Sequence, residues 1–196
     1  MAKLKLPKGK RRVRYVDGYS IRYMTPDLFD IVMVKNGRNP APFVPADEIW
    51  IDRCYERETQ FLLEVLRIEL SKRFRGLPYR SIRRALRKLL KPAPIPRFVV
   101  RQERHGGIKV KYVKGEIIRQ HLDPAFVFGG HDLIYPYVPE KEIWIDIRQD
   151  ERELAFTLMH ELHERAFMAR GLSYDEAHDL SIASEMMARV RKFIVH

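Results

Sequence analysis

Hydrophobic and polar positions follow the same order twice along the chain. Each copy begins with β-branched and aromatic residues flanking a turn pair, Asp17-Gly18 or Lys114-Gly115, which predicts a β-hairpin. A stretch rich in proline and glycine follows, and its composition predicts an irregular segment. A short strand with the sequence EIWID comes next, at 48–52 and again at 142–146.

Helical periodicity follows each EIWID strand. The first helix is expected at about 56–75 in one copy and at about 151–170 in the other. A glycine after each of these segments is typical of a helix C-terminus. A second helix begins near Tyr79 or near Tyr174, and in the second copy Ser173 with Glu176 predicts a capping box.

Four blocks of sequence recur in the same order, with offsets between 94 and 97 residues, which indicates an internal duplication. We therefore expect an α+β fold of two ββ-β-α-α units packed about a pseudo-twofold axis. The expected domains are an N-terminal basic repeat at 1–91, a proline-rich connector at 92–98 and a C-terminal repeat at 99–196. Two independent domains on a linker remain the alternative architecture.

Composition and charge narrow the class of protein. The 196 residues contain 45% hydrophobic and 32% charged residues, which is typical of a folded protein. No apolar run approaches the roughly 18–20 residues that cross a bilayer, and no apolar segment follows the basic N-terminus, so we expect a cytoplasmic protein without a membrane span. The single cysteine, Cys54, has no partner for a disulfide. Two asparagines and four glutamines beside many charged residues point to a thermophilic source.

A cluster of histidines and glutamates distinguishes the second copy from the first. His160 and Glu164 lie one turn apart on the first predicted helix, and His178 lies on the second. The corresponding positions of the first copy hold no histidine. Imidazole and carboxylate groups are ligands of catalytic Zn²⁺, so we expect these three residues to bind zinc or another divalent metal. Glu161, turned about 100° from His160, is placed to act as the general acid and base.

Three further residues near this cluster are candidates for an additional ligand or for positioning one: Glu185, His163 and Tyr174. His121 and His131 precede the second EIWID strand and rank below them. On the second helix, His178, Ser181, Glu185 and Arg189 form a polar stripe, and Leu180, Ala183 and Met187 form an apolar one. Two antiparallel helices would bring the polar stripes of both face to face.

The segment from His160 to His178 resembles the zinc-binding helix of the zincin metallopeptidases, which carries the motif HExxH and a distant third ligand. This resemblance implies a zinc-dependent hydrolase, with His160, Glu164 and His178 as ligands and Glu161 as the catalytic carboxylate. The chain departs from the motif at Glu164, where zincins have histidine. A histidine at 178 and a glutamate at 164 preserve two imidazoles and one carboxylate, but they leave peptidase activity itself open.

The first copy suggests a different function. Residues 1–98 carry 23 lysines and arginines against 10 acidic residues, whereas residues 99–196 carry 14 against 16. A helix from Tyr79 onward presents basic residues around an apolar stripe, and these are candidate nucleic-acid contacts: Arg80, Arg83, Arg84, Arg87 and Lys88. The alternative function is therefore nucleic-acid binding or assembly without catalysis. The same basic surface would also suit the acidic second copy, and a metal retained only for stability is a third alternative.

Overall fold

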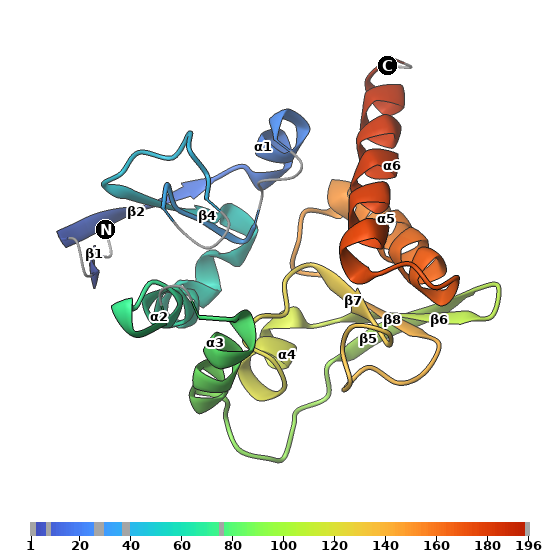
Figure 1. The fold of residues 1–196 in the computed structure, drawn as a ribbon, viewed down its shortest axis with the longest axis horizontal. Helices are drawn as coiled ribbons and strands as arrows, with labels where there is room; N and C mark the ends of the chain where they lie inside the picture. Colours follow the sequence, from blue (N-terminus) through green and yellow to red (C-terminus); the bar gives the residue numbers. More distant parts are fainter. Residues whose placement is uncertain (1–2, 7–8, 26–29, 37–39, 75–76, 195–196) are drawn as a thin grey trace. The chain divides into compact units, whose positions relative to one another are not determined.

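The computed structural model describes residues 3–6, 9–25, 30–36, 40–74 and 77–194. Over this part the chain has an α+β fold with two mixed β-sheets and six α-helices (Figure 1). It forms two compact units, one of Met1–Ile95 with Glu116–Ala125 and one of Pro96–Gly115 with Phe126–His196. Among the described residues, no helix is long and apolar enough to cross a membrane.

The first unit contains one sheet, with the strand order β1-β2-β4-β3, and three of its own helices. Its elements are β1 (Lys3–Leu6), β2 (Gly9–Val16), α1 (Gly18–Met24), β3 (Val32–Met33), β4 (Glu48–Asp52), α2 (Thr59–Glu69) and α3 (Tyr79–Leu86). Short 3-10 helices precede α2 at Arg53–Glu58 and follow α3 at Arg87–Leu89. The predicted helix at 56–75 is thus shorter than expected, because its first residues form this tighter helix.

The second unit contains the sheet β5-β6-β8-β7 and two long helices, of which α5 packs on the sheet and α6 packs on α5 (Figure 1). Its elements are β5 (Val99–His105), β6 (Ile108–Val113), β7 (Gly129–His131), β8 (Glu142–Asp146), α5 (Glu151–Ala169) and α6 (Tyr174–Ile194). The intervening helix α4 (Gly115–His121) groups mostly with the first unit. The repeat boundaries at 91/92 and 98/99 remain a prediction from sequence.

Both EIWID segments form strands, as predicted, and they occupy the same place in their sheets. β4 pairs in parallel with β2, and β8 pairs in parallel with β6. The register is equivalent as well, since Arg14 lies opposite Trp50 and Lys111 lies opposite Trp144. Neighbouring parallel strands need a crossover connection, and α1 and α4 lie within those connections.

The predicted hairpin turns at Asp17-Gly18 and Lys114-Gly115 are wrong, because both pairs begin helices. Asp17 is the N-cap of α1, and its carboxylate accepts hydrogen bonds from the backbone N–H and the hydroxyl of Ser20. The backbone N–H of Gly115 donates to Oδ1 of Asp146 at 3.0 Å, and a Cβ at this glycine would lie 2.0 Å from the same carboxylate. The hairpin of the second unit joins β5 and β6 through Gly106-Gly107, where Gly106 has a φ of 57°.

The ends of the two long helices are close to the prediction. α5 ends in a turn where Gly171, with a φ of 98°, donates its N–H to the carbonyl of Met168. The capping box of α6 is confirmed, because the N–H and the hydroxyl of Ser173 donate to the Glu176 carboxylate. The turn at Gly171 and the capping box at Ser173 together begin α6 only a few residues after α5 ends, so the two helices lie side by side.

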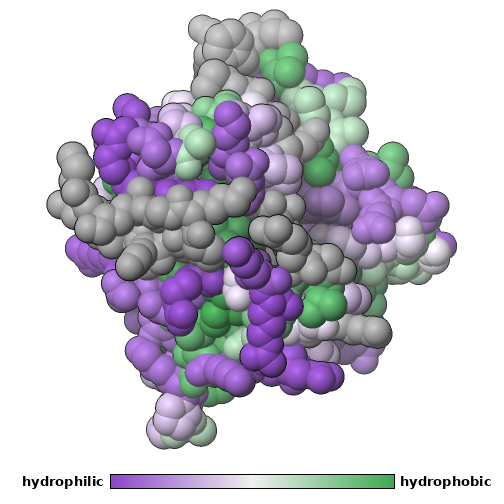
Figure 2. All heavy atoms as spheres, turned by 60° about the vertical axis from the view of Figure 1, so that its left-hand side comes forward, coloured by the Kyte–Doolittle hydropathy of each residue, from purple (hydrophilic) through white to green (hydrophobic). Residues whose placement is uncertain are grey.

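Each unit has its own apolar core. In the second unit, three leucines of α5 pack against the buried face of the sheet, as their helical spacing predicts: Leu154, Leu158 and Leu162. In the first unit, Ile82 and Leu86 of α3 pack against Val65 of α2. On the face shown in Figure 2, hydrophilic residues predominate and hydrophobic ones form small separate patches.

Candidate metal centre

The centre lies where α5 and α6 face each other and where β7 approaches α5. The carboxylate of Asp150 caps α5 by accepting the N–H of Arg152 at 2.9 Å. Because the leucines of α5 pack on the sheet, the adjoining helix face is left for polar residues, among which Glu161 and Glu164 are buried. The polar stripe of α6 is turned inward to meet it, since Ser181 and Arg189 are buried too.

Three donor atoms from α5 and α6 meet at this contact. Nδ1 of His178 lies 2.7 Å from Oε2 of Glu164, and Nε2 of His160 lies 3.2 Å from Nδ1 of His178. The distance from Nε2 of His160 to Oε2 of Glu164 is 3.4 Å. Around a tetrahedral zinc ion with bonds of about 2.0–2.1 Å, neighbouring donor atoms lie about 3.3 Å apart. The three donors therefore have the spacing of ligands around one cation, and they could hold a metal ion.

His131, which the sequence ranked low, joins the cluster from β7. It is fully buried, and its Nε2 lies 3.0 Å from Oε1 of Glu164. Its other ring nitrogen, Nδ1, accepts the backbone N–H of Leu133 at 3.3 Å. A nitrogen that accepts a hydrogen bond carries no proton, so in the neutral ring the proton is on Nε2. His131 therefore donates to one oxygen of Glu164, while the other oxygen faces His160 and His178.

Glu161 lies next to Glu164 on the buried side of α5. It forms a second group of metal-ligand type with His131 and Glu164, whose donor atoms lie within 4.8 Å of one another. Glu161 is only 8% exposed, and its Oε2 has no hydrogen-bond partner. Its Oε1 lies so close to β7 that a Cβ at Gly129 would approach it to 2.9 Å. The glycine of this strand thus provides the space that the carboxyl group occupies.

A chain of charged groups continues from His160 along α6. Nδ1 of His160 lies 3.2 Å from Oε2 of Glu185, on the side of the ring that faces away from Glu164. Oε1 of Glu185 accepts from Nε of Arg189 at 3.0 Å, and Arg189 also donates to both oxygens of the buried Glu153. Glu185 is thereby positioned beside His160, where its charge favours the protonated imidazole, although Nδ1 of His160 has no hydrogen-bond partner of regular geometry.

The electrostatics of the cluster favour a positive charge. Burial alone would raise the pKa of Glu164, but hydrogen bonds from His131, His160 and His178 hold it well below the ordinary value. Burial alone would lower the pKa of His160, yet the carboxylates of Glu164 and Glu185 raise it to about 10. The site therefore holds a proton on an imidazole where a divalent cation would replace it.

The pKa of Glu161 is shifted in the opposite direction from that of Glu164. Burial first, and the nearby charge of Glu164 second, raise the pKa of Glu161 to about 8. Two neighbouring carboxyl groups thus differ widely in their affinity for a proton. In catalytic sites, a pair of this kind combines a carboxyl group that exchanges a proton, here Glu161, with one that stays ionised, here Glu164.

The remaining candidates of the second copy fall into two groups. Tyr174 stacks on the ring of His178, with the ring centroids 5.3 Å apart and the planes inclined by 24°, so it supports a cluster residue. The side chain of His178 is 37% exposed, which leaves the centre open to solvent on this side. His163 is exposed and lies edge-on against Phe167, and it is in neither of the two groups of possible ligands.

The basic residues of the first copy are separate from this centre. Arg83 forms an ion pair with Asp123, within the first unit. Arg84, Arg87 and Lys88 are exposed, and the side chain of Arg80 lies outside the described part of the structure. A role for these residues in nucleic-acid binding stays a prediction.

Sequence reasoning brought His160, Glu164 and His178 together, but it ranked His131 low and gave Gly129 no role in the site. The spacing of His160, Glu164 and His178 is local, whereas His131 is 33 residues away from Glu164 in the chain. The Gly129-Gly130 pair before His131 is the one signal that indicates a close approach to this strand.

Comparisons with family models, with curated proteins and with solved structures give no match for this chain. The structure supports a coarser statement, that histidines and glutamates of α5, α6 and β7 form a group that could hold a metal ion.

Proposed function

We propose that this protein is a metal-dependent hydrolase whose centre is formed by His160, Glu164 and His178. The observation that carries the proposal is the mutual spacing of their donor atoms, 2.7, 3.2 and 3.4 Å, which matches ligands of one cation. Two imidazoles and one carboxylate favour Zn²⁺ among the common divalent ions. A zinc ion in such a site would supply a bound water of lowered pKa.

His131 is proposed as a positioning residue and not as a ligand. Metal binding through Nε2 would place the proton of the ring on Nδ1, where the N–H of Leu133 already points at the ring. The protonated Nε2 instead fixes one oxygen of Glu164, so that the other oxygen faces the helix histidines. For this reason we assign one ion to the cluster rather than two.

Glu161 is proposed as the group that accepts and returns a proton during hydrolysis. Its carboxyl oxygen Oε2 is buried without a partner, and its pKa is raised to about 8, so both protonation states are accessible near neutral pH. A buried carboxyl group without a partner is costly to the fold, and catalytic sites commonly retain such groups. The bond that is hydrolysed, whether amide, ester or phosphoester, is the next question for experiment.

The proposal is tested first by metal content. Tag-free protein purified from zinc-supplemented medium is expected to contain one zinc ion per chain by elemental analysis. His160→Ala and His178→Ala should each lower the zinc affinity by at least tenfold, whereas His163→Ala, on the exposed side of α5, should leave it unchanged. A wild-type chain without stoichiometric metal, or equal losses in all three variants, contradicts the proposal.

Catalysis is tested with Glu161→Gln, which keeps the size of the side chain and removes its acid–base function. This variant should keep its zinc and lose at least a hundredfold in the rate of hydrolysis of whichever peptide, ester or phosphoester the wild type cleaves. Zinc that raises the melting temperature of a wild type inactive on all three classes would instead indicate a structural ion.

We also propose that the two repeats, 1–91 and 99–196, arose by internal duplication. Supporting observations are the same strand order in both sheets and the same pairing of β2 with β4 and of β6 with β8. Trp50 and Trp144 each donate Nε1–H to the glutamate two residues earlier, at 2.7 and 3.0 Å. On this proposal, the His/Glu cluster is a feature that only the second copy carries.

A further inference from the structure

The side of α6 that faces away from the metal centre carries an exposed apolar stripe. Leu180 is 45% exposed, and Met187 and Val190 are each 58% exposed. Ala183 lies between them and is exposed as well. Large apolar side chains gathered on one helix face, on a single element, mark a surface for association. The stripe is distinct from the polar residues of α6 that contact His160 and Glu164.

The spacing of this stripe is that of a helix pair. Residues 180, 183, 187 and 190 repeat with alternating steps of three and four, as the a and d positions of a coiled coil do. The set is also symmetric about residue 185, because 180 and 190 are equally far from it, and so are 183 and 187. In an antiparallel pair of identical helices centred there, Leu180 would pack on Val190 of the second copy, and Ala183 on Met187.

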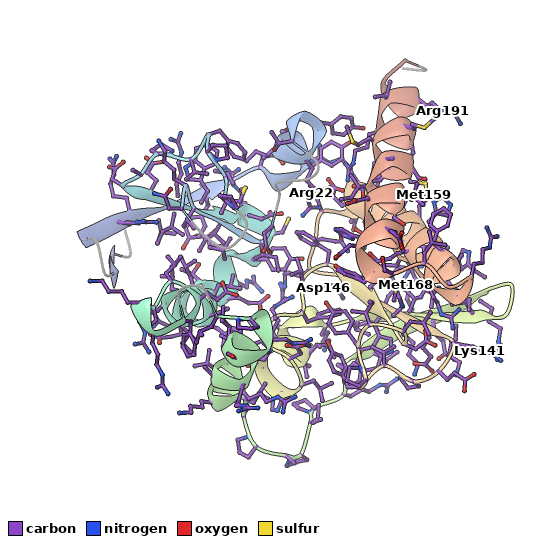
Figure 3. All side chains as sticks on the ribbon, in the orientation of Figure 1. Arg22, Lys141, Asp146, Met159, Met168 and Arg191 are labelled. Carbon is purple, nitrogen blue, oxygen red and sulfur yellow. The ribbon has the colours of Figure 1, made fainter. Side chains whose placement is uncertain are left out.

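The charges along α6 favour the same orientation. The exposed charged side chains of its first half are acidic, namely Asp175, Glu176 and Asp179, whereas Arg191 is exposed near its end. Figure 3 labels Arg191 on the last turns of α6, where its side chain projects from the helix. An antiparallel partner brings the acidic half of each helix to the basic half of the other, and it also opposes the helix dipoles. A parallel pair would place like charges side by side.

The end of α6 is accessible to such a partner. Arg189 pairs with Glu153 in the first turn of α5, so the residues of α6 after 189 extend past the start of α5. Figure 1 shows these turns projecting beyond α5. Val190 thus lies at the point where the stripe leaves the helix pair of its own unit.

We propose that a second copy of this chain docks on the stripe, with the two α6 helices antiparallel and their midpoint at residue 185. The proposal rests on the exposed stripe, its symmetry and the charge pattern of α6, and it stands independently of the metal centre. A single helix pair is a small interface, so we expect a dimer that dissociates on dilution.

The first experiment measures mass against concentration. By sedimentation or light scattering, the wild type should shift from the monomer mass of 23.3 kDa to twice that value as the concentration rises. Met187→Lys should weaken dimerisation by at least tenfold and should keep the melting temperature of the wild type at concentrations where both are monomeric. Val100→Lys, at a similarly exposed position on β5, is the matched control and should dimerise as the wild type does. A wild type that stays monomeric at all concentrations, or a Met187→Lys variant that dimerises fully, overturns the proposal.

The second experiment tests the orientation with single cysteines in a Cys54→Ser background. In the antiparallel pair, two copies of Ser184→Cys are offset by only about 3 Å along the helix axis, whereas two copies of Val190→Cys are offset by about 15 Å. A short bismaleimide should therefore cross-link the first variant and not the second. Cross-linking of Val190→Cys in preference to Ser184→Cys would indicate parallel helices and overturn the proposed arrangement.

Discussion

Gly129 and Glu161 are coupled by a close contact between β7 and α5. A Cβ at Gly129 would lie 2.9 Å from Oε1 and 3.0 Å from Cγ of Glu161, and both residues are buried. Gly129→Ala must therefore displace the carboxyl group or the strand, and we expect it to lower the free energy of unfolding by about 1–3 kcal/mol. Denaturant unfolding of metal-free protein measures this loss.

Gly107→Ala is the matched control for this prediction. A Cβ at Gly107 meets no atom within 4 Å, so the same substitution should change the stability by less than about 0.5 kcal/mol. Equal effects of the two alanines would mean that the loss arises from the flexibility of glycine in general and not from contact with Glu161.

The candidate site was predictable from sequence where its geometry is local. His160 and Glu164 are one turn apart, so helical periodicity alone places them on one face, and the short turn at Gly171 brings His178 to them. His131 was not identified in this way, because its position depends on the pairing of β7 with β8. Long-range pairing of a three-residue strand leaves little pattern in the sequence.

At the scale of elements, the two EIWID strands and the long helices α5 and α6 were predictable from the sequence pattern, whereas the turn pairs, β3, β5 and β7 were not. Asp17-Gly18 is a hairpin signal, and aspartate followed by glycine also begins helices, since its carboxylate accepts the free N–H groups of a first turn. The parallel pairing of β2 with β4 then decides between the two, because a direct hairpin cannot join parallel strands. That pairing depends on residues more than 30 positions apart.

The pairing of β6 with β8 predicts a pH dependence of stability. Burial alone would raise the pKa of Glu142, but hydrogen bonds from Lys111, Trp144 and Lys109 hold it below its ordinary value of 4.5. The folded state thus binds this proton less readily than the unfolded state. Its contribution to stability is complete above about pH 4.5 and is lost as the pH falls below that value. Glu142→Gln should therefore destabilise the protein at pH 7 and have less effect at pH 3.

Thermal unfolding between pH 3 and pH 7 measures this difference. Glu140→Gln is the matched control, because the side chain of Glu140 is 84% exposed and its nearest cation lies 3.8 Å away. We expect its melting curve to follow that of the wild type throughout. A constant difference between Glu142→Gln and wild type across the pH range would show that the carboxyl group is held by packing and not by charge.

At the scale of the whole molecule, the two compact units do not follow the order of the chain. The segment Glu116–Ala125 belongs to the first unit, although it lies between strands of the second. Arg119 in this segment donates to both oxygens of Glu58 at 2.8 and 2.7 Å, and both side chains are buried. The chain therefore passes between the two units at 95/96, 115/116 and 125/126, and sequence composition alone predicted no such exchange.

This exchange predicts that residues 1–98 do not fold without the segment that follows. Such a fragment lacks Arg119, the partner of Glu58, together with the rest of 116–125. Where Glu58 stays buried, as its side chain is in the whole chain with 4% exposed, the loss of this partner costs about 3–5 kcal/mol. That cost is a large part of the stability of a small domain. We expect fragment 1–98 to unfold without cooperativity in circular dichroism, and fragment 1–125 to recover a cooperative transition. Arg119→Met within 1–125 should abolish that recovery, because this fragment contains the added segment but lacks the guanidinium group that pairs with Glu58. A cooperative transition of 1–98 alone would mean that the first unit is complete before α4, and that Arg119 is dispensable to it.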